Sequence, residues 1–257
     1  MKSLIEDISS KQFKSVYLFY GEEAYLKTLY KNKLKSAIMD TEDTMNLNIY
    51  GGKGINVKEV IDQAETMPFF ADKRLILIEN SGFFKNASPE LAEYIPQIPS
   101  ETCMVFVEDE VDKRGKLYKA VKSSGRVVEM GRQNEKALMN WVLTALRREK
   151  KNITSATMEL FLTRTGNDME NISKELEKLL CYTMGRDVIT AEDVKAICTE
   201  QTENKIFEMI NAIAEKRQKK ALDLYYDLLA LKEPPMRILY LITRQFNLLM
   251  QVKDLQN

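Results

Sequence analysis

Glycine-containing turns that could hold a phosphate group are the first candidates for chemistry in this chain. The turn at 20–25 (YGEEAY) follows an apolar run, the place where a nucleotide usually binds in a doubly wound sheet. It carries one glycine and no Lys-Ser/Thr pair, and Glu22 and Glu23 would repel phosphate there. The stretch Gly51-Gly52-Lys53-Gly54 also departs from the P-loop pattern and is interpreted as a flexible turn. We therefore expect no nucleotide cofactor.

Other catalytic residue types are scarce. The chain has no histidine, which excludes Ser-His and Cys-His catalysis and histidine metal sites. Its three cysteines are far apart and predict reduced thiols of a cytoplasmic protein: Cys103, Cys181 and Cys198. Two apolar runs end in acids, Glu79 and Glu108-Asp109, as a magnesium-binding Walker B strand does, but without a P-loop they are interpreted as residues that solvate strand ends. We predict no catalytic residue and no metal site.

A basic segment at 112–126 could contact phosphate groups of nucleic acid. It contains one acid, Asp112, and six basic residues: Lys113, Arg114, Lys116, Lys119, Lys122 and Arg126. Two interpretations stay open, a solvated helix face, which such runs usually are, and a contact with DNA. Over the whole chain basic and acidic side chains balance at 38 each, which argues against a protein that binds nucleic acid or membranes through its overall charge.

The segment Met67-Pro68-Phe69-Phe70 is apolar where a polar turn is expected, between a predicted helix and a predicted strand. Adjacent side chains of a regular element cannot both enter one core. One interpretation is a hydrophobic cap on the edge of the sheet. The other is an exposed aromatic anchor for a partner protein.

Apolar periodicity predicts the elements that position these residues. In the first half, strands at 15–20, 45–50, 73–79, 102–108 and 126–130 alternate with helices at 26–38, 57–65, 89–95 and 116–122. This alternation predicts an α/β fold, a doubly wound domain with a mostly parallel sheet of about five strands.

After Gly131 only helical signals continue. Helices are expected at 135–148, 154–162 and 168–180, and Thr190 with Asp193 forms a capping-box signature for a short fourth helix. From Thr202 three more helices follow, the last beginning after a break at Pro234-Pro235 and apolar along much of its length. It therefore predicts an oligomeric contact or sequence beyond Asn257. No apolar run exceeds five residues, so neither a membrane span nor a secretory leader is expected.

Taken together, these segments resemble the delta subunit family of the bacterial DNA polymerase III clamp loader over essentially the whole chain. The resemblance rests on four segments in order: YLFYGEE at 17–23, MPFFADKRL at 67–75, VFVE at 105–108 with DKR at 112–114, and GND at 166–168. It implies an AAA+-like architecture. Its three expected parts are a RecA-like α/β domain at 1–132, a helical lid at 133–200, and at 201–257 the first part of a helical collar that looks truncated.

The resemblance also implies what the chain does. In the family, the segment equivalent to 67–70 is a hydrophobic wedge that enters a pocket on the sliding clamp, which makes Met67, Phe69 and Phe70 the expected anchors. The implied role is a non-catalytic subunit that binds and opens the clamp for loading onto primed DNA within the DNA polymerase III holoenzyme. The implied partners are the sliding clamp (beta), the delta-prime and gamma/tau subunits, and primed DNA within the complex. The charge of the basic segment, and not the resemblance, makes four of its residues candidates for a contact with DNA or a partner: Lys113, Arg114, Lys116 and Lys119.

Two other functions stay open. The first is an NTPase or nucleotide-dependent switch with a degenerate P-loop, which predicts saturable ATP binding. The second is a helical adaptor whose function lies in 202–257, which predicts that this part alone captures partners.

Overall fold

The structure, a computed structural model, describes residues 1–39, 43–86, 88–199 and 202–255. The chain divides into two compact units, Met1–Gln133 and Asn134–Asn257. The predicted three-part division, with a boundary at residue 200, stays a prediction.

The first unit contains one five-stranded sheet in the order β2-β3-β4-β1-β5. All four neighbouring pairs are parallel, as the strand–helix alternation predicts. The strands are β1 (Val16–Tyr20), β2 (Leu47–Gly51), β3 (Arg74–Glu79), β4 (Thr102–Glu108) and β5 (Arg126–Glu129). The helices are α1 (Lys2–Ser10), α2 (Ala24–Ile38), α3 (Val57–Glu65), α4 (Pro89–Tyr94), continued by a 3₁₀ turn η1 (Ile95–Gln97), and α5 (Lys116–Ser124).

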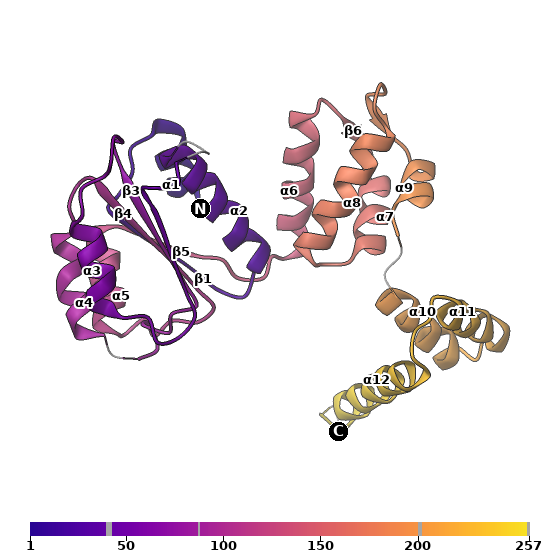
Figure 1. Ribbon diagram of the computed structural model, residues 1–257. Coiled ribbons are helices and arrows are strands. Elements are labelled where there is room, and N and C mark those ends of the chain that lie inside the picture. Colours follow the sequence, from indigo (N-terminus) through magenta and orange to yellow (C-terminus); the bar gives the residue numbers. More distant parts are fainter. Residues whose placement is uncertain (40–42, 87, 200–201, 256–257) are drawn as a thin grey trace. The chain divides into compact units, whose positions relative to one another are not determined.

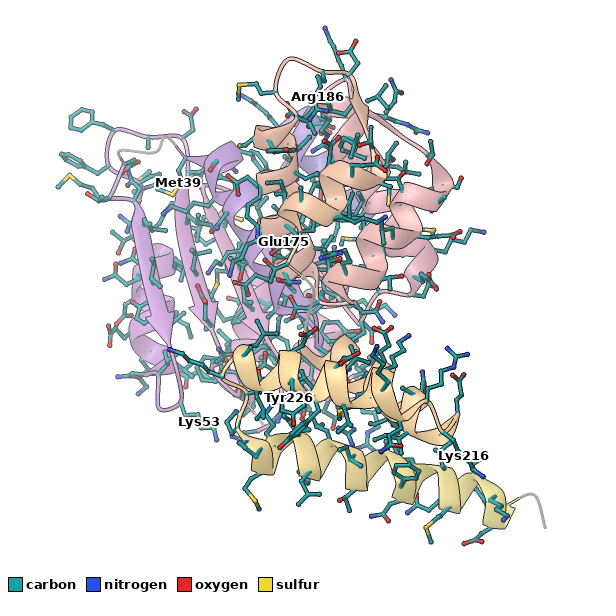
Figure 2. All side chains as sticks on the ribbon, turned by 90° about the vertical axis from the view of Figure 1, so that its right-hand side faces the viewer. Met39, Lys53, Glu175, Arg186, Lys216 and Tyr226 are labelled. Carbon is teal, nitrogen blue, oxygen red and sulfur yellow. The ribbon has the colours of Figure 1, made fainter. Side chains whose placement is uncertain are left out.

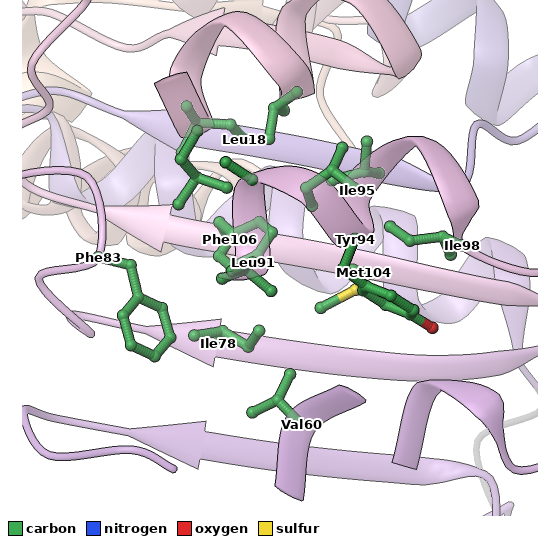
Figure 3. Close-up of a cluster of buried hydrophobic side chains, with 14 of the residues drawn as sticks. Leu18, Val60, Ile78, Phe83, Leu91, Tyr94, Ile95, Ile98, Met104 and Phe106 are labelled. Atoms are coloured by element: carbon green, nitrogen blue, oxygen red, sulfur yellow. The ribbon is translucent and has the colours of Figure 1, made fainter. Parts of the chain in front are cut away.

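Helices cover both faces of this sheet. Figure 1 shows α3, α4 and α5 on one face and α1 and α2 on the other. The core beneath α3–α5 is built from alternate residues of the central strands, such as Leu18, Ile78 and Phe106, against Val60 of α3 and Leu91 of α4 (Figure 3). Strands buried on both faces read as continuous apolar runs, which explains why β1, β3 and β4 were predictable from sequence.

Among the α-helices of the first unit, α1 is the one that periodicity did not predict. It is short and buries only Leu4 and Asp7, while Ile5 is exposed. Its large apolar residues, Leu4, Ile5 and Ile8, span little more than one helical turn, which is too short a pattern to identify a helix by spacing alone.

The second unit is helical and contains one small two-stranded sheet. Its first helices are α6 (Glu135–Arg148), α7 (Ser155–Thr165), α8 (Met169–Tyr182) and α9 (Ala191–Ile197). The expectation that strands end at Gly131 is wrong, because Asn152–Ile153 (β6) and Val188–Ile189 (β7) pair in parallel. Two residues are too few to show a strand period. The capping box predicted at Thr190 and Asp193 is confirmed.

Three further helices complete this unit: α10 (Thr202–Ala214), α11 (Gln218–Ala230) and α12 (Pro235–Leu255). They share a small core of Ile206, Met209, Ile210, Leu228 and Ile238. Ile238 is the one buried residue among those described in α12. Many large apolar side chains of this helix are exposed: Met236, Leu239, Tyr240, Leu248, Leu249, Met250, Val252 and Leu255. Within the described residues, no helix combines the length and apolarity that a bilayer crossing requires.

Candidate functional site

The loop between α3 and β3 presents an exposed apolar cluster. Met67, Phe69 and Phe70 are 78%, 55% and 95% exposed. The two aromatic rings contact each other edge to face, with centroids 4.5 Å apart and an interplanar angle of 81°. The interpretation of this segment as an apolar cap does not fit these exposures, because a cap buries its side chains.

This loop lies at the amino edge of the sheet, because it leads into the first residue of β3 and all five strands run in one direction. Figure 2 labels Met39 at this edge and Lys53, which follows β2, at the opposite edge. The turn after β1 also lies at that opposite, carboxyl edge. The apolar cluster and the position where a nucleotide binds in doubly wound folds are therefore at different ends of the sheet.

The backbone of the loop is held by two buried polar side chains that the sequence did not single out. Asn46, just before β2, is 1% exposed and hydrogen-bonds Phe69. Arg74, the first residue of β3, is 6% exposed and donates to the carbonyls of Thr66 and Met67. The sequence did contain a signal for this role of Arg74, because an arginine at the start of an apolar strand is expected to be buried. A buried charge needs hydrogen-bond partners nearby.

The turn after β1 is filled by contacts within the protein. The backbone N–H of Gly21 donates to Asp109 O (3.2 Å), and that of Glu23 donates to Met130 O (2.9 Å). The buried Lys27 of α2 places Nζ 2.6 Å from Asp109 Oδ1. Helix α2 begins at Ala24, so Glu22 and Glu23 precede it, and Glu22 pairs with Arg132. Two amide groups near the position of a phosphate, those of Gly21 and Glu23, therefore already have acceptors.

The acids at the strand ends also have internal partners. Glu79 pairs with Lys31 at 2.8 Å. Glu108 is 3% exposed and accepts hydrogen bonds from the Ser81 N–H and hydroxyl and from the Gly82 N–H, which fixes the turn after β3. The interpretation that these acids solvate strand ends is therefore wrong for Glu108. In the part of the chain that the structure describes, no cluster of three or more acids or cysteines could hold a metal ion.

The structure separates the basic residues of 112–126 into two groups. Lys113 bonds Glu129, which also accepts from the Tyr20 hydroxyl, and these two bonds lower the pKa of Glu129. Arg114 bonds Asp112 and lowers the pKa of that carboxyl. Arg126, at the edge strand β5, pairs with Asp7 and is only partly exposed. The second group lies along α5 at helical spacing and is exposed: Lys116, Lys119 and Lys122. Lys113 and Arg114 are exposed as well, but each is paired with a carboxylate, and the contact of this segment with DNA stays a prediction.

The parallel sheet with strand order β2-β3-β4-β1-β5, followed by helical segments, is an AAA+-like fold. The solved structure of the Bacillus subtilis DNA clamp loader delta protein is similar to this chain with a TM-score of 0.78 and 27% identity. The match covers 99% of this chain and 79% of that one.

Sequence comparisons agree. A model of the DNA polymerase III delta subunit matches residues 17–131, and a model of the C-terminal domain of that subunit matches residues 203–257. The DNA polymerase III subunit delta of Bacillus subtilis (strain 168) is 29% identical over 250 residues, covering 93% of this chain and 72% of that protein. The probable DNA polymerase III subunit delta of Aquifex aeolicus (strain VF5) is 24% identical over 241 residues, covering 89% of this chain and 67% of that protein. The chain belongs to the DNA polymerase III delta subunit family, the delta subunits of the clamp loader.

Proposed function

We propose that this chain binds the ring-shaped sliding clamp through Met67, Phe69 and Phe70 and opens it for loading onto primed DNA, without catalysing a reaction itself. The single observation that carries this proposal is an apolar cluster exposed on a fixed loop. Phe70 is 95% exposed although the buried cores of the same chain contain many phenylalanines. A large aromatic side chain held in water is costly unless a partner buries it, and such residues dominate the affinity of protein interfaces.

The energy available from this contact is large enough to act on a ring. Burying two phenylalanines and a methionine removes roughly 400 Å² of apolar surface, on the order of 10 kcal/mol before costs. Association and side-chain ordering cancel about half or more of that. A ligand opens a closed ring only by binding the open state more tightly than the closed one, by the amount of that difference. We infer that the contact favours the open state of the clamp.

Surface plasmon resonance with the cognate sliding clamp tests the proposal. Phe69→Ala and Phe70→Ala should each cost about 2–4 kcal/mol of clamp affinity, as truncations of interface hot spots do. Tyr226→Ala is the matched control, because Tyr226 is 64% exposed on α11, in the other unit (Figure 2), and should bind as wild type. A folded Phe69→Ala/Phe70→Ala double variant with wild-type affinity would contradict the clamp contact.

We further propose that the chain does not bind ATP. The N–H groups of Gly21 and Glu23 are occupied by Asp109 O and Met130 O, and Lys27 is held by Asp109. A phosphate would have to displace these bonds and approach Glu22. Titration calorimetry with magnesium-ATP should give no saturable heat, whereas binding that is lost on Glu22→Ala would favour the nucleotide-switch function.

Contact with primed DNA through the basic segment is also proposed, with delta-prime and gamma/tau subunits as the other partners in a cytoplasmic complex. Lys116 and Lys119 are exposed on α5, while Lys113 and Arg114 already bond carboxylates. Lys116→Glu/Lys119→Glu should weaken DNA binding by the assembled loader and reduce its salt dependence, with clamp binding unchanged. An unchanged salt dependence would leave this helix face as a solvated surface.

A further inference from the structure

The amide of Asn46 satisfies both backbone groups of Phe69. Its Oδ1 accepts from the Phe69 N–H at 2.6 Å, and its Nδ2 donates to the Phe69 carbonyl at 2.9 Å. The second Nδ2 proton is used as well, because Asp43 Oδ2 accepts at 2.8 Å. The Asn46 side chain thus makes the same two hydrogen bonds to the Phe69 backbone that a neighbouring β-strand would make. These bonds hold the Phe69 backbone in one position.

Asn46 is itself fixed by the sheet. Its carbonyl accepts from the N–H of Leu75 in β3 at 2.8 Å, and its own N–H donates to Asp43 Oδ1 at 3.1 Å. With 1% exposure, the amide has no water available to replace these partners. Loss of the side chain would leave the N–H and C=O of Phe69 to find new partners, and the loop would adopt several conformations.

Arg74 holds the beginning of the same loop. Its Nε donates to the carbonyl of Thr66 at 2.9 Å, and one terminal nitrogen donates to that of Met67 at 3.3 Å. Thr66 is the C-cap of α3, so the guanidinium satisfies a carbonyl that the helix leaves unpaired and complements the negative end of its dipole. The other terminal nitrogen donates to Asn48 Oδ1 at 2.8 Å, which ties the group to β2.

The conformation held between these two anchors is not one that the residues prefer. Phe70 has a φ of 49°, in the left-handed region that bulky residues seldom adopt. Such a backbone persists only where the surroundings impose it. In this conformation the Phe69 and Phe70 rings contact each other edge to face, with their centroids 4.5 Å apart.

We propose that Asn46 and Arg74 are positioning residues that preorganise the aromatic pair for its partner. This role rests on the proposed clamp contact and adds that affinity comes partly from a loop that needs no ordering on binding. Asn46 fixes the aromatic end of the loop, and Arg74 fixes the end that carries Met67. Neither side chain has to touch the clamp.

A double-mutant cycle separates positioning from general stability. Asn46→Ala should weaken binding to the sliding clamp about 10-fold in the wild-type background and less than about 2-fold in a Phe69→Ala/Phe70→Ala background, because misplaced rings matter only while the rings are present. Asn171→Ala is the matched control, since its Nδ2 donates to the Thr165 carbonyl at 2.7 Å in the other unit. It should leave clamp affinity unchanged.

Two further measurements support the cycle. In the full chain without clamp, the Phe69 amide should exchange hydrogen about 10-fold faster in Asn46→Ala than in wild type. Arg74→Lys keeps the charge but loses the fork of donors, so it should also weaken binding. If Asn46→Ala does not fold, Arg74→Lys replaces it in a cycle with Met67→Ala, because Arg74 holds the end of the loop that carries Met67.

The outcomes distinguish this inference from the function on which it rests. If Phe70→Ala weakens binding but Asn46→Ala binds as wild type, or weakens it equally in both backgrounds, the positioning role is wrong and the clamp contact stands. If the Phe69→Ala/Phe70→Ala double variant binds as wild type, the clamp contact itself is wrong.

Discussion

Asp7 and Arg126 form a two-pronged ion pair across 119 positions of sequence, with Arg126 Nε 2.6 Å from Asp7 Oδ2 and a terminal nitrogen 2.8 Å from Oδ1. The Tyr17 hydroxyl donates to the same carboxylate at 3.1 Å. These bonds join α1, β1 and the edge strand β5. Because the helix itself buries few apolar side chains, we expect this pair to contribute to holding α1 on the sheet.

Asp7→Asn should lower the free energy of unfolding by about 2 kcal/mol, below the cost of breaking a fully buried pair because Arg126 stays partly solvated. Urea denaturation followed by circular dichroism measures the loss. Asp112→Asn is the control, since its pair with Arg114 is exposed, and its denaturation midpoint should match wild type. Equal midpoints for all three proteins would show that α1 is held by other contacts.

Gly21→Ala should destabilise the protein by about 3 kcal/mol, because the substitution combines left-handed strain with a collision. Gly21 has a φ of 126°, and a Cβ there would lie 2.4 Å from the carbonyl oxygen of Met130. Gly52 has a φ of 82°, and no atom lies within 4 Å of the position that a Cβ would take. Gly52→Ala should therefore lower the free energy of unfolding through backbone strain alone, by about 1 kcal/mol. Similar losses for the two variants in thermal unfolding would argue against the collision.

One of the three cysteine thiols should react rapidly with a thiol reagent, and the other two should react slowly. Burial raises the pKa of Cys103 to about 12 and that of Cys198 to about 11, so both stay protonated and shielded at neutral pH, whereas Cys181 is exposed. Titration of the native protein with a colorimetric thiol reagent at pH 8 should give one rapid equivalent, and three after denaturation. Rapid reaction of Cys181→Ser would mean that a buried thiol becomes accessible.

The capping box of α9 should make stability depend on pH. Asp193 Oδ2 accepts from the Thr190 N–H at 2.9 Å, and this bond together with Arg186 lowers the pKa of the carboxyl. A carboxyl with a depressed folded-state pKa stabilises the fold above its unfolded pKa of about 3.9, and that contribution disappears as pH falls through the lower folded pKa.

Asp193→Asn should therefore cost about 1 kcal/mol near pH 7, and the difference from wild type should shrink as pH falls below about 4. Urea midpoints measured between pH 3 and pH 7 (roughly the range over which carboxyls titrate) give the comparison. Asp168→Asn is a useful reference, because Asp168 caps α8 by accepting from the Asn171 N–H and asparagine is an equally good cap. A pH-independent Asp193→Asn loss would assign the effect to geometry and not to charge.

The sequence by itself determined most of the helices and strands of this chain, because these elements form from patterns of neighbouring residues. The apolar run at 102–108 predicted a strand buried on both faces, and the spacing of Thr190 and Asp193 predicted the start of a helix. Both signals are readable because backbone period and helix capping depend on residues within a few positions of each other. The apolar loop at 67–70 was also recognisable, since it broke the pattern around it.

Only the tertiary structure decided how these parts are used. Sequence left two interpretations of Phe69 and Phe70, and their exposure follows from which side chains the folded sheet has room to bury. The roles of Asn46 and Arg74, the occupants of the turn after β1 and the placement of α1 depend on bonds such as Asn46–Phe69 and Arg126–Asp7, which join residues 23 and 119 positions apart. Such bonds form only once the path of the chain is fixed. The sequence around a polar side chain does not indicate which distant group it will contact in the folded protein.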